Sequence, residues 1–88
     1  MKMIFLEDKI RKYFFSENLK SPSDIIYKEI LECIRNLKTK EELSGDLISR
    51  KKTVILNHFS SFFNFKSVES QKIEIEKALK VINEIIEN

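Results

Sequence analysis

Cysteine and histidine, which often act as nucleophiles, bases or zinc ligands, each occur once in this 88-residue chain, as Cys33 and His58. A zinc site needs three or four ligands, and the acidic residues show no clustering that would complete one around these two. A nucleophile–base pair would require Cys33 and His58 to meet across the fold. The helical spacing favours instead a core position for Cys33 and a position at the edge of the core for His58.

Motifs that bind phosphates, metals or dinucleotides are missing from the sequence. It contains no P-loop, GxGxxG, HExxH, EF-hand loop or CxxC, and its single glycine excludes most loops that cradle phosphates. We therefore expect a protein that is not an enzyme and that uses neither a cofactor nor a metal.

The tightest basic run is Arg50-Lys51-Lys52, in a chain whose net charge is +2. Phosphate binding usually needs more positive charge along one face. A helix-turn-helix register that uses Gly45 as the turn glycine places charged Glu41 and Lys51 at core positions. These observations make nucleic-acid binding the weakest of the binding hypotheses, although the run stays among the candidate partner-binding residues.

A cluster of four phenylalanines follows within seven residues: Phe59, Phe62, Phe63 and Phe65. These rings cannot all lie on one helical face. Most of them are expected to close the end of the core. One or two are expected to stay exposed as an anchor for a protein partner, ringed by His58, Asn64 and Lys66. The candidate partner-binding residues are Arg50, Lys51, Lys52, His58, Phe62, Phe63, Phe65 and Lys66.

The elements that must position these residues are helices. One glycine and one proline leave little turn chemistry, and apolar residues recur at helical spacing over most of the chain. The pattern predicts a single domain with helices at residues 3–15, 24–38, 40–63 and 68–87. Four amphipathic helices with short connections indicate an all-α fold, an antiparallel up-and-down four-helix bundle in which the last two helices form the longer hairpin.

The apolar stripes of the second and fourth predicted helices name specific core residues. The second helix should begin after Ser23 as N-cap and bury Ile26, Ile30, Cys33 and Leu37. The fourth should begin after Ser67 and bury Ile75, Leu79, Ile82 and Ile86, with Glu76 and Lys80 paired on its outer face. The third helix has two possible starts: a capping box at Thr39 to Glu42, or a cap at Ser44 directly before Gly45.

The compartment expected for this chain is the cytoplasm. A lone cysteine allows no intrachain disulfide, which favours a reducing environment. The first residues do not resemble a signal peptide, and no apolar run approaches the roughly 18–20 residues of a transmembrane helix. Peripheral association with a membrane stays compatible with these features.

Several short segments spread over residues 23–83 match those of a known family: Ser23-Asp24-Ile25, Leu31, Leu37, Leu47-Ile48-Ser49-Arg50, Phe63-Asn64-Phe65-Lys66-Ser67, Ile75, Leu79 and Ile82. In these segments the chain resembles the immunity proteins of class IIa (pediocin-like) bacteriocins, of the enterocin A and leucocin A type.

This resemblance implies a cytosolic, non-enzymatic four-helix bundle that protects a producer cell from its own bacteriocin. The implied partner is the membrane permease of the mannose phosphotransferase system once bacteriocin is bound to it. The implied contact region is the turn Phe63 to Ser67 together with the last helix. Two alternatives stay open: another small helical protein-binding module, such as a phage-type inhibitor or an assembly subunit, and a nucleic-acid-binding regulator.

Overall fold

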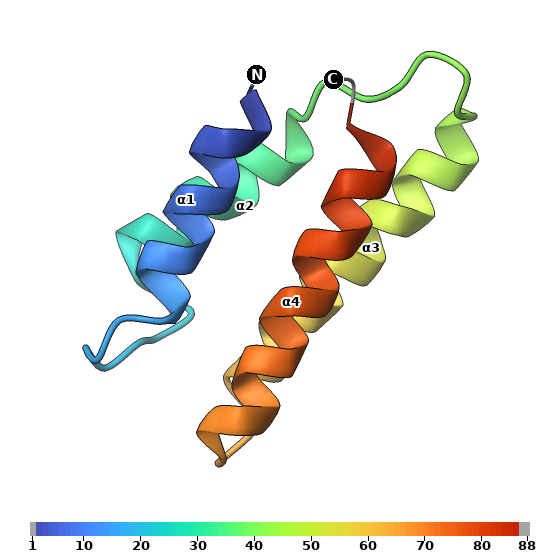
Figure 1. Ribbon diagram of the computed structural model, residues 1–88. Helices are drawn as coiled ribbons and strands as arrows, with labels where there is room; N and C mark the ends of the chain where they lie inside the picture. The colour runs from blue at the N-terminus through green and yellow to red at the C-terminus, as the bar shows by residue number, and fades with distance from the viewer. Residues whose placement is uncertain (1, 87–88) are drawn as a thin grey trace.

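In the computed structural model, residues 2–86 form four α-helices, and side chains are described from residue 5 to residue 86. The helices are α1 (Lys2–Phe14), α2 (Ile25–Arg35), α3 (Gly45–Phe62) and α4 (Val68–Ile85). Successive helices run in opposite directions, so the chain forms an antiparallel up-and-down bundle (Figure 1). The all-α prediction is confirmed. The last helix is shorter than the predicted 68–87, because it ends at Ile85 and Ile86 is extended; position 87 itself lies outside the described residues.

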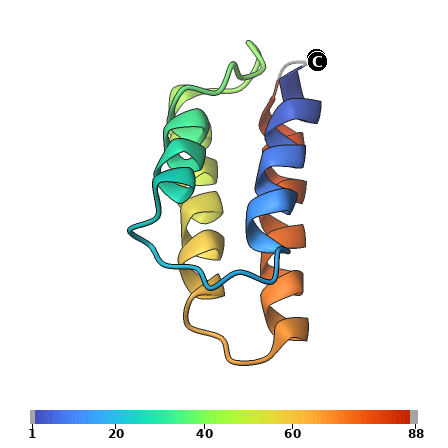
Figure 2. The ribbon, with the colours of Figure 1, turned by 90° about the vertical axis from the view of Figure 1, so that its left-hand side faces the viewer.

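The bundle consists of two helical hairpins. The α3–α4 hairpin has 18 residues in each helix, whereas α1 has 13 and α2 has 11. In Figure 2, α1 lies in front of α4 and α2 lies in front of α3, so each helix has two neighbours. The predicted long hairpin is present, and the shorter hairpin covers one side of it.

All four helices contribute to one apolar core. Burial of a Leu, Ile or Phe side chain contributes about 1.5–3 kcal/mol, so this core holds the hairpins together. The predicted stripe of α4 is confirmed, because each of its four residues is buried. The buried apolar residues are Leu6, Ile10, Phe14, Tyr27, Ile30, Ile34, Ile55, Phe59, Phe62, Ile75, Ala78, Leu79, Ile82, Ile85 and Ile86.

The predicted core face of α2 is wrong by about one residue of rotation. Cys33 is exposed and Ile26 is 45% exposed, whereas Tyr27 and Ile34 are buried on either side of Ile30. The Tyr27 ring is the reason, because it packs against Phe14 of α1 and against Phe59 of α3. Turning α2 to bury this large ring moves the small Cys33 side chain to the surface.

The ends of α2 also differ from the prediction. The N-cap is Asp24 rather than Ser23, and its carboxylate accepts hydrogen bonds from the Ser21 backbone N–H and the Tyr13 hydroxyl rather than from α2. These bonds hold the pKa of Asp24 below its ordinary value, with the Ser21 N–H as the main cause. The helix ends at Arg35 instead of residue 38, and the Lys52 ammonium donates a hydrogen bond to the Arg35 carbonyl.

The start of α3 follows the Ser44 alternative. The Ser44 hydroxyl accepts a hydrogen bond from the Leu47 N–H, and Gly45 is the first helical residue. The capping-box residues from Thr39 belong to the connection between α2 and α3. There Lys40 donates its backbone N–H to the Ile85 carbonyl, and Thr39 forms an isolated bridge with Ile86. Residues 41 and 42 then form a turn, in which the Leu43 N–H donates to the Lys40 carbonyl.

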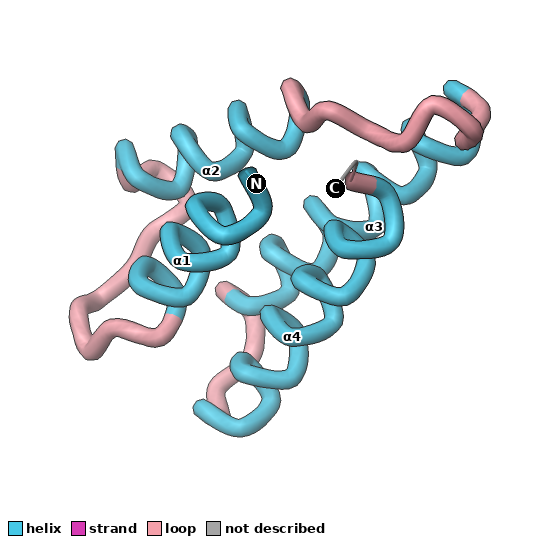
Figure 3. The backbone as a smooth tube through the Cα atoms, turned by 45° about the horizontal axis from the view of Figure 1, so that its top comes forward, coloured by secondary structure: helices cyan, strands magenta, loops and turns pink. Residues whose placement is uncertain are grey.

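The loops are divided between the two ends of the bundle. Residues 15–24 and 63–67 turn at one end, and residues 36–44 cross the opposite end (Figures 1 and 3). The up-and-down topology therefore places the α1–α2 loop and the phenylalanine-rich α3–α4 turn at the same end.

Candidate partner-binding surface

The α3–α4 turn projects beyond the shorter hairpin. In Figures 1 and 2 the turn lies farther along the bundle axis than the loop that joins α1 to α2. We call residues 63–68 the hairpin tip. Ser67 caps α4 by accepting a hydrogen bond from the Ser70 N–H, so the predicted start of this helix is confirmed.

The phenylalanines divide between core and surface as the ring geometry predicted. Phe59 and Phe62 are buried, and Phe63 is half-buried with its ring 5.0 Å from the Tyr27 ring. Phe62 packs edge-on against Phe14 at 4.8 Å, so it is a core residue and must be removed from the candidate partner-binding set. Phe65, by contrast, is 41% exposed, so it is the ring of this cluster that lies at the surface.

Val68 extends the apolar surface of the tip and was not singled out from the sequence. It is 66% exposed, although it lies seven residues before Ile75 and fourteen before Ile82 on the same face of α4. That spacing is the signal for a core position. Val68 is exposed because α1 ends at Phe14 and the longer hairpin continues past it.

The lysines of the basic run, Arg50 to Lys52, contact two different helices. The Lys51 ammonium pairs with Glu84 of α4 at 3.1 Å, whereas Lys52 reaches the Arg35 carbonyl of α2 at 2.8 Å. Arg50, the residue before them, is exposed. Because Lys51 and Lys52 contact different helices, the run forms no continuous basic face of the kind that binds a phosphate backbone.

His58 lies within the α3–α4 hairpin and away from the tip. Its Nδ1 is 2.8 Å from a carboxylate oxygen of Glu74, and both side chains are mostly buried. The other oxygen of Glu74 is 3.9 Å from the Lys77 ammonium. His58 therefore contributes to the packing of the two helices. The other two residues that were expected to surround the aromatic anchor, Asn64 and Lys66, lie in the tip and are exposed.

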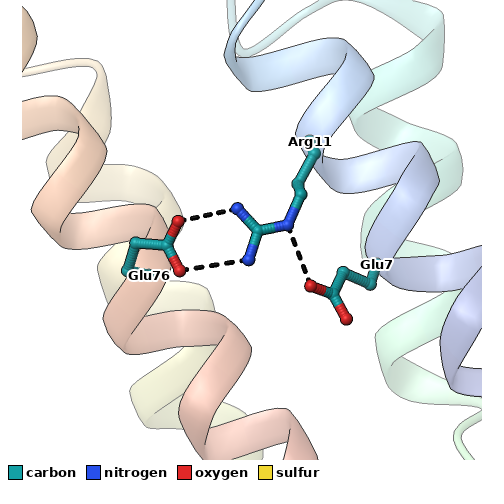
Figure 4. Close-up of polar contacts among 3 residues, drawn as sticks. All are labelled: Glu7, Arg11 and Glu76. Atoms are coloured by element: carbon teal, nitrogen blue, oxygen red, sulfur yellow. Dashed lines mark hydrogen bonds and ion pairs between the residues drawn. The ribbon is translucent and has the colours of Figure 1, made fainter.

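The ion pair between Arg11 and Glu76 was not predicted from the sequence, because it joins residues that are far apart in the chain. Arg11 of α1 donates two hydrogen bonds to the Glu76 carboxylate, at 2.6 and 3.1 Å, and a third to Glu7 at 2.9 Å (Figure 4). The hydrogen bond to Glu76 is the main reason why the pKa of Arg11 is raised, and it lowers the pKa of Glu76. The sequence predicts a pair between Glu76 and Lys80, but Glu76 pairs with Arg11 of α1 instead.

No known protein family, curated protein or solved structure matches this chain. Function must therefore be inferred from its residues and their arrangement.

The candidate site among the described residues is a surface for binding. Among residues 2–86, no three His, Cys, Asp or Glu side chains gather as metal ligands. No helix in this part of the chain has the length and apolar character of a membrane span. This surface is the hairpin tip, which carries the exposed side chains of Phe65, Lys66 and Val68.

Proposed function

We propose that this chain is a bacteriocin immunity protein that works by binding a protein partner through its hairpin tip. The observation that carries the proposal is the exposure of Phe65 and Val68 at the projecting end of the longest hairpin. Large apolar side chains in such a place give up contact with water when a partner covers them, and aromatic residues are common binding hot spots.

The resemblance to class IIa immunity proteins supplies the partner. In that assignment the tip and α4 face the mannose permease with bacteriocin bound to it, from the cytosolic side. The matched segments occupy positions compatible with the assignment: Phe63 to Ser67 form the tip, whereas Ile75, Leu79 and Ile82 are buried in α4. The split basic run disfavours the nucleic-acid alternative, which requires a contiguous cationic face.

A protection assay tests the proposal. The chain is expressed inside a strain that is sensitive to class IIa bacteriocins, and the cells are challenged with a panel of those peptides. We expect the lethal dose of one peptide, or of a few related peptides, to rise selectively. Soluble expression with no shift for any peptide would reject the immunity assignment.

Matched variants then locate the contact surface. Phe65→Ala removes the exposed ring of the tip, and Phe5→Ala removes an 80% exposed ring near the opposite end of the bundle. Loss of protection with the first variant and retention with the second would support the tip. Equal protection by both variants would reject the tip as the binding surface.

A further inference from the structure

Gln71, a half-buried residue in the first turn of α4, reaches back across the hairpin tip. Its side-chain nitrogen donates to the Phe62 carbonyl at 3.1 Å and to the Phe65 carbonyl at 3.2 Å. One amide group therefore ties the last residue of α3 and the middle of the turn to α4. Both partners are carbonyl oxygens, which only accept, so the contact requires the two N–H donors of glutamine.

The backbone hydrogen bonds of the turn are made to α3. The N–H groups of Phe63, Asn64 and Phe65 donate to the carbonyls of Ser60 and Ser61 and continue the last turn of that helix. The Phe63 ring packs against Tyr27 of α2. Between the end of α3 and the Ser67 cap, the described hydrogen bonds that join the turn to α4 are those of Gln71.

The orientation of the Phe65 ring depends on the backbone of the turn more than the orientations of the neighbouring phenylalanine rings do. Phe59, Phe62 and Phe63 each pack against other aromatic rings, but within residues 5–86 the Phe65 ring makes no such contact. The backbone of the turn sets the direction in which the Phe65 side chain leaves the main chain, and Gln71 bonds that backbone from the α4 side.

We propose that Gln71 is a positioning residue, which holds the turn so that Phe65 is presented to the partner in one orientation. The inference rests on the proposed partner-binding function of the hairpin tip. A contact that is ordered before binding avoids the entropy cost of ordering during binding. Loss of the Gln71 donors should therefore weaken partner binding even though Gln71 need not touch the partner.

Amide hydrogen exchange tests the positioning directly and does not depend on any partner. Gln71→Met keeps the length of the side chain and removes both donors. Asn83→Met, on an exposed position near the other end of α4, makes the same kind of replacement with no described contact to the tip. We expect exchange at the amides of Phe63, Asn64 and Phe65 to rise on the order of tenfold in Gln71→Met only, with the Ile55 and Ile82 amides unchanged. Unchanged exchange at the turn would overturn the proposal.

A double-mutant cycle then tests whether Gln71 acts through Phe65. In the wild-type background, Gln71→Met should reduce protection about tenfold. In a Phe65→Ala background, expressed at a level high enough to leave measurable protection, it should have little further effect. An equal reduction in both backgrounds would overturn the positioning role. If the wild-type chain protects against no peptide, the proposed function fails, and the exchange measurement still decides whether Gln71 holds the turn.

Discussion

Arg11 and Glu76, which are 65 residues apart in the sequence, form a two-point ion pair that joins α1 to α4. The planar guanidinium matches the carboxylate with two parallel hydrogen bonds, and its third donor holds Glu7 on the same helix. The pair spans the boundary between the two hairpins and adds a polar contact to the apolar core that holds them together (Figure 4).

Glu76→Gln should destabilise the bundle slightly at neutral pH. The pair is partly exposed, with 37% of the Arg11 side chain and 55% of the Glu76 side chain accessible, so solvent screens it. We expect the free energy of unfolding to fall by up to about 1 kcal/mol, measured by urea denaturation. Asn83→Gln, an exposed change on the same helix, is the control and should have no effect.

The same pair predicts a dependence on pH. Because Arg11 lowers the pKa of Glu76, the carboxylate contributes stability above its ordinary pKa of 4.5 and loses that contribution as the pH falls through its lowered value. The difference in unfolding free energy between wild type and Glu76→Gln should therefore be present at pH 7 and shrink in acid below 4.5. A difference that grows on acidification would contradict the assigned ion pair.

Ile82→Asp should unfold the protein or leave it barely stable. Ile82 is completely buried in the stripe of α4, and an unpaired carboxylate there costs several kcal/mol. The neighbouring exposed change Asn83→Asp adds the same charge and should retain a cooperative melt by circular dichroism. A normal melting curve for Ile82→Asp would show that this face of α4 is not in the core.

Phe62→Ala and Phe65→Ala should have opposite effects on stability and function. Phe62 is buried against Phe14, so its truncation should cost about 3–5 kcal/mol of unfolding free energy. Phe65 is exposed, so its truncation should cost less than about 1 kcal/mol. The Phe65 variant should nevertheless lose protection. If its melting temperature instead fell as far as that of Phe62→Ala, Phe65 would belong to the core.

Cys33 should react with a thiol reagent in the folded protein. Its side chain is exposed on α2, so an aromatic disulfide reagent should modify it without prior denaturation. Cys33→Ser should change the unfolding free energy by no more than about 0.5 kcal/mol. A thiol that reacts only in denaturant would restore the core position expected from the sequence.

The sequence predicts the helices well because their apolar periodicity is strong, but it does not determine the rotation of α2. Ile26, Ile30 and Cys33 form one plausible stripe, and Tyr27, Ile30 and Ile34 form another. The choice depends on rings from α1 and α3 that pack around Tyr27. Local spacing contains no information about those neighbours.

The candidate site, too, could be predicted from the sequence only in part. The exposure of one ring in the phenylalanine cluster follows from helical geometry, and Phe65 is that ring. The exposure of Val68 does not follow, because its spacing from Ile75 is that of a buried residue. It depends on where α1 ends relative to α4, which is a property of the assembled bundle.

The placement of the first residues of α1 and the last residues of α4 has a practical consequence. The first residues of α1 and the last residues of α4 lie at the same end of the bundle, and the hairpin tip lies at the other (Figure 1). A fluorescent protein, a biotin or a sensor surface attached through either end would therefore leave the tip facing solution. The same arrangement would present Phe65, Lys66 and Val68 outward from any support, which suits the chain to display and immobilised-binding formats.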